Sequence, residues 1–120
     1  MSTKYQAGML GQQEAENFLL SNGYRILERN YRVRAGEVDL IARHEGYVIF
    51  VEVKFRKGLD FGHPCEAVGF KKQQRIVHTA LHYITAKNLD NHNFRFDVLE
   101  VLATNEGIRV NHIKNAFDAF

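Results

Sequence analysis

Two carboxylates and one ammonium interrupt the most apolar part of this sequence. In the stretch GEVDLIARHEGYVIFVEVKFRK (36–57), Asp39 lies in the first apolar run, and Glu52 and Lys54 lie in the second. Aliphatic or aromatic side chains normally occupy strand positions that face a core. Two acids at one site can hold a hard divalent cation such as Mg²⁺, and an ammonium nearby can support negative charge on a phosphate.

These residues are predicted to lie on a β-hairpin with a two-residue turn at Glu45-Gly46, because Gly favours the second turn position. The numbers of opposite residues then sum to 91, and opposite residues share a face of the sheet. One face is entirely apolar and consists of Val38, Leu40, Ala42, Ile49, Val51 and Val53. The other face pairs Ile41 with Phe50, then Asp39 with Glu52, and then Glu37 with Lys54. A slip of one residue would mix the two faces, so the alternation favours this register.

Carboxylates that lie directly opposite each other repel, which destabilises the pair or makes one of them take a proton. A divalent cation held by Asp39 and Glu52 would compensate the repulsion. Lys54, on the same face, could then polarise a water or support charge on a phosphate. The alternative is a structural cluster of salt bridges among Glu37, Asp39, Glu52 and Lys54. Such a cluster rarely stabilises a core more than apolar packing does, so the spacing favours a functional site.

The elements around the hairpin predict one α/β domain over residues 1–120, in the order αβββαββ, with a mixed central sheet flanked by helices. Helices are expected over about 7–22 and 66–87, strands over 24–34, 94–103 and 108–113, and a loop over 58–64. One face of the second helix is predicted to carry Gln73, Ile76, Val77, Ala80, Leu81 and Ile84. Gln73 is polar on this otherwise apolar face, so it either points back at the site or is an ordinary polar residue near the helix end.

Basic residues gather in three short clusters, at 25–34, 54–57 and 71–75, which contain ten of the sixteen lysines and arginines. A local positive field of this kind can attract an anionic polymer even though the net charge is only +2. The side chains expected to hold a phosphate backbone are Arg32, Arg34, Arg56, Lys72 and Arg75. An ordinary solvated surface is the alternative for each cluster.

The composition is that of a globular protein, with 45% hydrophobic and 25% charged residues. The only cysteine, Cys65, cannot form a disulfide within the chain, which fits a reducing compartment. The N-terminus lacks the apolar run of a signal peptide, and no segment approaches the roughly 20 apolar residues of a membrane span. We therefore expect a cytoplasmic protein with no membrane partner.

Four segments together resemble a known family. GEVDLIA (36–42), FVEVKFR (50–56), residues 72–80 and RFDV (95–98) look like the YraN-like family of uncharacterised bacterial proteins, within the PD-(D/E)xK nuclease superfamily. The resemblance extends from Gly11 to about Val101. It implies a restriction-endonuclease-like fold similar to archaeal-type Holliday-junction resolvases and a role in nucleic-acid metabolism. It also implies that Asp39 and Glu52 bind the metal and that Lys54 is the catalytic lysine.

The sequence departs from the family pattern at one position. The family usually has Gly-Glu at the start of the first helix, where the glutamate completes the metal site, whereas this chain has Gly11-Gln12. An amide oxygen is a weaker ligand for a hard cation than a carboxylate. Glu16 lies one turn later on the same helix face and is a candidate substitute.

We therefore expect a Mg²⁺- or Mn²⁺-dependent endonuclease that binds its metal weakly and hydrolyses DNA, with branched DNA among its substrates. A homodimer is compatible with this expectation. A non-catalytic DNA-binding protein on the same fold is the first alternative, because of Gln12. The second alternative is a structural protein that binds neither metal nor DNA.

Overall fold

A computed structural model describes residues 4–57 and 68–118 of the chain. Its elements are α1 (Lys4–Ser21), β1 (Arg25–Val33), β2 (Gly36–His44), β3 (Tyr47–Lys57), α2 (Phe70–Ala86), β4 (Asn93–Thr104) and β5 (Gly107–Ile113). This order is the predicted αβββαββ. The predicted loop at 58–64, Cys65 and the first residues of the predicted second helix lie outside the described residues. Neither α1 nor α2 contains a stretch long and apolar enough to cross a membrane.

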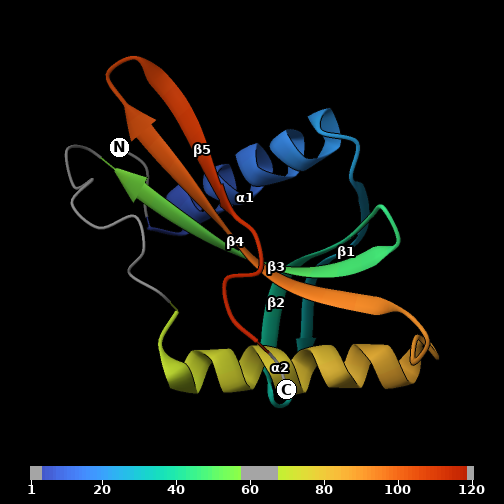
Figure 1. Ribbon diagram of the computed structural model, residues 1–120. Coiled ribbons are helices and arrows are strands. Elements are labelled where there is room, and N and C mark those ends of the chain that lie inside the picture. Colours follow the sequence, from blue (N-terminus) through green and yellow to red (C-terminus); the bar gives the residue numbers. More distant parts are fainter. Residues whose placement is uncertain (1–3, 58–67, 119–120) are drawn as a thin grey trace.

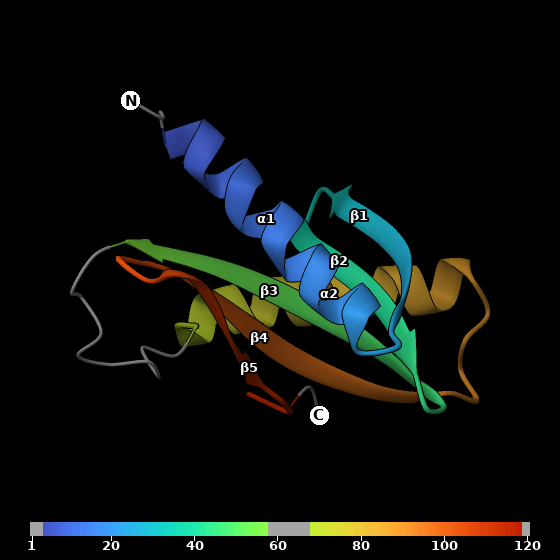
Figure 2. The ribbon, with the colours of Figure 1, turned by 90° about the horizontal axis from the view of Figure 1, so that it is seen from above.

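The five strands form one mixed sheet in the order β1-β2-β3-β4-β5. β3 and β4 run parallel, whereas the other neighbours are antiparallel, which confirms the predicted mixed sheet. α1 covers one face of the sheet and α2 covers the other (Figures 1 and 2). The parallel pair requires a crossover connection between β3 and β4, and α2 lies within that connection.

A hydrophobic cluster on each face holds one helix against the sheet. On the α1 face, Ala15 and Leu19 pack with Leu40, Ala42, Ile49, Val51, Leu99 and Val101. On the α2 face, Ile76, Ala80, Tyr83 and Ile84 pack with Val38, Ile41, Phe50 and Phe96. The side chains of β3 therefore alternate between the two helices, so neighbouring positions on this strand face different surroundings.

The predicted face of α2 is partly wrong. Leu81 is 37% exposed, whereas Thr79 and Tyr83 are buried and were not predicted to be. The hydroxyl of Thr79 donates to the Arg75 carbonyl at 2.7 Å, which satisfies its polar group inside the core. Tyr83 packs edge-on against Tyr31 of β1, with ring centroids 5.0 Å apart. The buried stripe is thus rotated towards the sheet residues that these side chains contact.

The hairpin has the predicted register from His44–Tyr47 to Leu40–Val51, with every pair summing to 91. The prediction for Val38 is wrong, because Val38 packs on the α2 face while Leu40 packs on the α1 face. The alternation also changes on β1, where Arg29 pairs with Leu40 and Tyr31 pairs with Val38. Between them, Asn30 has a left-handed φ of 50°, which Asn tolerates better than most residues. The irregularity lies beside Asp39.

Candidate active site

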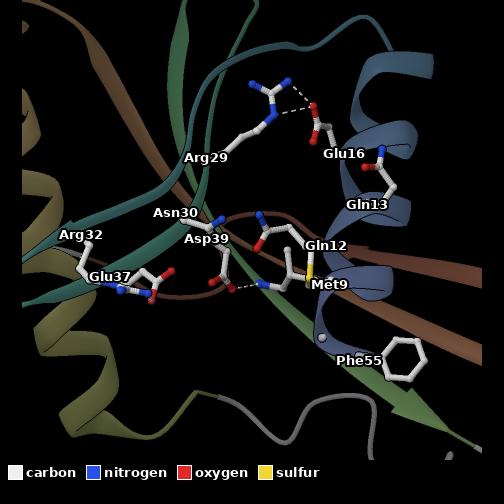
Figure 3. A pocket seen from close by; sticks show the side chains of 12 residues that line it. Met9, Gln12, Gln13, Glu16, Arg29, Asn30, Arg32, Glu37, Asp39 and Phe55 are labelled. Carbon is white, nitrogen blue, oxygen red and sulfur yellow. Dashed lines mark hydrogen bonds and ion pairs between the residues drawn. The ribbon is translucent and has the colours of Figure 1, made fainter. Parts of the chain in front are cut away.

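Asp39 lies at the point where the regular pairing of β2 and β3 ends. The register described above stops at Leu40–Val51, one residue before Asp39. The Asp39 carboxylate accepts the main-chain N–H of Val53 at 2.8 Å (Figure 3). A side-chain oxygen of β2 therefore takes the place of a main-chain carbonyl as the acceptor for this N–H of β3. The bond fixes the Asp39 carboxyl group where the regular pairing ends, which we call the gap between β2 and β3.

The surroundings of Asp39 raise its pKa from 3.8 to about 7. Burial is the largest cause and the negative charge of Glu52 is the second, while the N–H of Val53 opposes the shift. The structure thus brings together the two acids that the hairpin register placed opposite each other. The negative charge of Glu52 therefore disfavours ionisation of Asp39.

Glu52 lies on the α2 face of β3. Its side chain is only 6% exposed, and its carboxylate forms an ion pair with Lys72 in the first turn of α2, whose side chain is 53% exposed. Lys54, half-buried, follows two residues later on the same strand. The carboxyl groups of Asp39 and Glu52 thus interact at the gap, and Lys54 lies two residues further along β3.

A cleft of about 790 Å³ opens beside Asp39 on the α1 face (Figure 3). Residues of α1, β1, β2 and β3 line it, and they include Met9, Gln12, Gln13, Glu16, Arg29, Asn30, Arg32, Glu37, Val53 and Phe55. Gln12 projects from α1 towards Asp39 across the cleft. Gly11 makes this approach possible, because a Cβ at Gly11 would lie 2.9 Å from the Cβ of Phe55.

The other two acids of the cleft are engaged by arginines. Nε and a terminal nitrogen of Arg29 both donate to Glu16, and Arg32 pairs with Glu37 at 3.2 Å. Figure 3 shows the Glu16 carboxylate turned towards Arg29 rather than towards Asp39. Within the described parts of the chain, no group of three or more His, Cys, Asp or Glu side chains is placed to share a metal ion. Neither Glu16 nor Glu37 therefore joins Asp39 and Glu52 as a third acidic ligand.

Two other residues singled out in the sequence have structural contacts. The side-chain amide of Gln73 donates to the Val68 carbonyl at 2.7 Å, at the start of α2. Nε of Arg56 lies 3.2 Å from a carboxylate oxygen of Glu100, and the Arg56 side chain is only 21% exposed. Both side chains are thus engaged within the protein.

The remaining basic residues lie near the gap on two elements. Arg32 lies near the end of β1 and Arg34 lies in the turn between β1 and β2. The start of β2 meets α2, because a Cβ at Gly36 would lie 3.2 Å from the Cβ of Arg75. Lys72, also on α2, forms its ion pair with Glu52 at the gap. The fold therefore brings the β1–β2 turn, which contains Arg34, beside the third basic cluster on α2.

Sequence reasoning missed two buried acids on β4. Glu100 is 1% exposed, pairs with Arg56 and accepts the Asn111 amide at 2.9 Å. Asp97 is also 1% exposed and is bound by Arg95 and His112. Both acids interrupt an apolar strand run, FDVLEVL, as Asp39 and Glu52 do. The same signal could therefore have found them.

Comparisons with other proteins agree with the motifs. The profile of the uncharacterised protein family UPF0102 matches residues 11–101. A UPF0102 protein of Clostridioides difficile is 50% identical over 112 residues, which cover 93% of this chain and 96% of the relative. Another, of Clostridium acetobutylicum, is 47% identical over 114 residues, with 93% of both chains covered.

Among solved structures, the crystal structure of SSO0001 is similar, with a TM-score of 0.44 and 18% identity. The match covers 98% of this chain and 55% of that protein, so the chain spans about half of its length. Membership of the family is shown instead by the profile and by relatives that match almost the whole chain. The chain belongs to the uncharacterised protein family UPF0102, the YraN-like family of the PD-(D/E)xK-like nuclease superfamily that its motifs resemble.

Proposed function

We propose that this protein is a metal-dependent nuclease that hydrolyses DNA phosphodiesters at Asp39, Glu52 and Lys54. The observation that carries the proposal is the meeting of Asp39 and Glu52 at the gap between β2 and β3. Burial and the charge of Glu52 raise the pKa of Asp39 to about 7, which is unfavourable for a purely structural pair. Perturbed acids beside a cleft are typical of functional sites.

The donor set fits a hard divalent cation. Mg²⁺ is usually held by one or two carboxylates and completes its octahedral shell with water and phosphate oxygens. Asp39 and Glu52 would provide the carboxylates, and the amide oxygen of Gln12 faces Asp39 across the cleft. When bound, such a cation supplies an activated water and neutralises charge on the leaving oxygen.

The chain's own residues would act on protons and phosphate. Asp39 must release its proton before it can bind a cation, so binding should become tighter as the pH rises through about 7. Lys54 would place an ammonium near the phosphate that is cleaved. Arg32, Arg34, Lys72 and Arg75 would hold neighbouring phosphates, because the β1–β2 turn meets α2 there. Branched DNA is the proposed preferred substrate, by resemblance to junction resolvases.

A second candidate is a DNA-binding protein on the same fold that does not cut. Gln12 favours it, because the family usually has a glutamate at this position, which completes the metal site. Glu16, the nearest acid along α1, is held by Arg29. A site with two carboxylates would bind a metal more weakly than a site with three, and the rate of hydrolysis would be lower.

The test is incubation of the pure protein with linear duplex, single-stranded and branched DNA, with and without Mg²⁺ or Mn²⁺. We expect cleavage only with metal, and we expect Asp39→Asn and Glu52→Gln to abolish it while DNA binding persists. Glu106→Gln is the matched control, because Glu106 is an exposed acid in the β4–β5 turn. Gln12→Glu should strengthen metal binding and increase cleavage.

The outcomes separate the candidates. DNA binding without cleavage of any substrate under any metal condition would favour the second candidate. Absence of binding to all three forms of DNA at low salt would exclude both nucleic-acid functions. The ionic cluster would then be structural.

A further inference from the structure

We infer that Lys72 couples metal binding to phosphate binding: it neutralises Glu52 in the DNA-free protein and releases it when a DNA phosphate binds. This inference rests on the proposed function, because it assumes that Glu52 is a metal ligand. It adds a positioning residue on α2 to the residues of the hairpin. It also predicts that the free protein binds metal more weakly than the DNA complex does.

The unequal burial of the two partners is the first argument. Glu52 is 6% exposed, so its carboxylate would be costly to bury without a positive partner. Lys72 is 53% exposed, so its side chain is also open to solvent and to an approaching polyanion. The acid depends on the lysine, whereas the lysine can change partners at little cost.

The position of Lys72 in its helix is the second argument. The first turn of α2 contains no acidic residue and two adjacent lysines, Lys71 and Lys72. The positive end of the helix dipole opposes cations there and favours anions such as phosphate. Arg75 lies one turn later. This arrangement is unfavourable for the helix alone and becomes favourable when a phosphate lies beside it.

Competition for the Glu52 carboxylate is the third argument. An ammonium in contact with this carboxylate repels a divalent cation at the same place. A phosphate oxygen from the substrate can bind the cation and also draw Lys72 away from Glu52. Metal and DNA should therefore each increase the affinity for the other by the same factor, as linkage requires.

The experiment compares Mn²⁺ binding to the DNA-free wild type, Lys72→Met and Lys71→Met by titration calorimetry. We expect Lys72→Met to bind Mn²⁺ about fivefold tighter or more, which is the lower range for coupled sites. Lys71→Met removes the same charge from the same exposed turn and should change the affinity much less. Lys72→Arg keeps the charge and should resemble the wild type.

A second arm measures DNA affinity with and without Mn²⁺ in a Lys54→Ala background, which should prevent loss of the DNA by cleavage. The gain in DNA affinity from Mn²⁺ should be smaller when Lys72→Met is also present. Equal Mn²⁺ affinity of wild type and Lys72→Met, with binding detectable, would overturn the coupling and leave the proposed metal site intact. No Mn²⁺ binding by any variant, with or without DNA, would instead overturn the metal site itself.

Discussion

Asp39 is a carboxyl group whose charged form the fold disfavours. The hydrogen bond from the N–H of Val53 lowers the pKa of Asp39, but burial and the charge of Glu52 raise it by more. A metal ion would reverse this balance by favouring the carboxylate. The residue that would bind metal is thus also one that weakens the metal-free fold at high pH.

The pH dependence of stability tests this interpretation. The pKa of Asp39 is raised from 3.8 to about 7, so the folded protein holds a proton that the unfolded chain has released over this range. Stability from this group is complete below about pH 4 and is lost as the pH rises through about 7. Urea unfolding from about pH 5 to about pH 8 should show the wild type losing stability relative to Asp39→Asn. Parallel curves for the two proteins would contradict the raised pKa.

At the scale of elements, α1 reaches the site because Gly11 allows it to lie close to β3. A Cβ at this position would lie 2.9 Å from the Cβ of Phe55, which is nearer than real Cβ contacts allow. Phe55 also packs at the border of the α1 cluster, so it cannot move freely. The glycine therefore determines how deeply Gln12 enters the cleft.

Gly11→Ala should consequently push α1 away from β3. We expect it to lower the free energy of unfolding by roughly 1–3 kcal/mol, as overpacking usually does. Gly8→Ala is the control on the same helix, because a Cβ at Gly8 meets nothing within 4 Å. That change should raise the stability by about 0.5–1 kcal/mol through better helix propensity. Equal effects of the two substitutions in urea unfolding would contradict the close approach.

A second buried acid, Asp97 of β4, holds β5 and Asn115, which follows it, against β4. Burial would raise the pKa of Asp97, but His112, Arg95 and the N–H of Asn115 together hold it below its usual value. Arg95 forms two hydrogen bonds to this carboxylate, at 2.8 and 2.9 Å, and His112 lies 2.6 Å from it. One carboxylate thus joins β4, β5 and the residues that follow.

Asp97→Ala should leave Arg95 and His112 without their acid partner inside the protein. Breaking a buried ion pair from one side typically costs roughly 3–5 kcal/mol, and we expect a loss of that order in urea unfolding. Asp90→Ala removes an exposed acid from the loop before β4 and should change the stability by no more than about 0.5 kcal/mol. A loss for Asp97→Ala as small as the control would show that the network is dispensable.

In the folded protein, basic residues from two distant segments lie near each other. Arg32 is near the end of β1 and Arg34 is in the β1–β2 turn, and Gly36 at the start of β2 lies against Arg75 of α2. Lys72 lies one helical turn before Arg75. A net charge of only +2 does not predict a polyanion partner, and the local grouping of basic residues is the feature on which the proposed DNA binding depends.

DNA binding should therefore weaken steeply with salt. For duplex DNA, log K should fall against log salt with a slope of about 0.9 for each phosphate neutralised. Replacing both Arg32 and Arg34 by Ala should flatten the slope by about two units if each contacts one phosphate. Glu37→Gln should preserve or improve binding, because it frees Arg32 from its acid partner. An unchanged slope in the double variant, measured by fluorescence anisotropy, would place the interface elsewhere.

Local patterns in the sequence determined the hairpin and, through it, the meeting of the two acids. The turn at Glu45-Gly46 and the alternation of apolar residues depend only on neighbours along the chain, and both agree with the observed register as far as Leu40–Val51. The order of elements followed in the same way from periodicity. The family also followed from the sequence, because its motifs are short segments that can be read directly.

The partners of these residues depend on contacts between distant segments of the chain. The Lys72–Glu52 ion pair depends on how α2 docks on the sheet, and no spacing along the chain encodes that docking. The placement of Val38 depends on the left-handed Asn30 in the neighbouring strand, which breaks the alternation that the prediction assumed. Leu81 is exposed, whereas Tyr83 is buried and packs against Tyr31 of β1. Contacts between distant segments are decided by the packing of whole elements, and a period of two or 3.6 residues cannot reveal them.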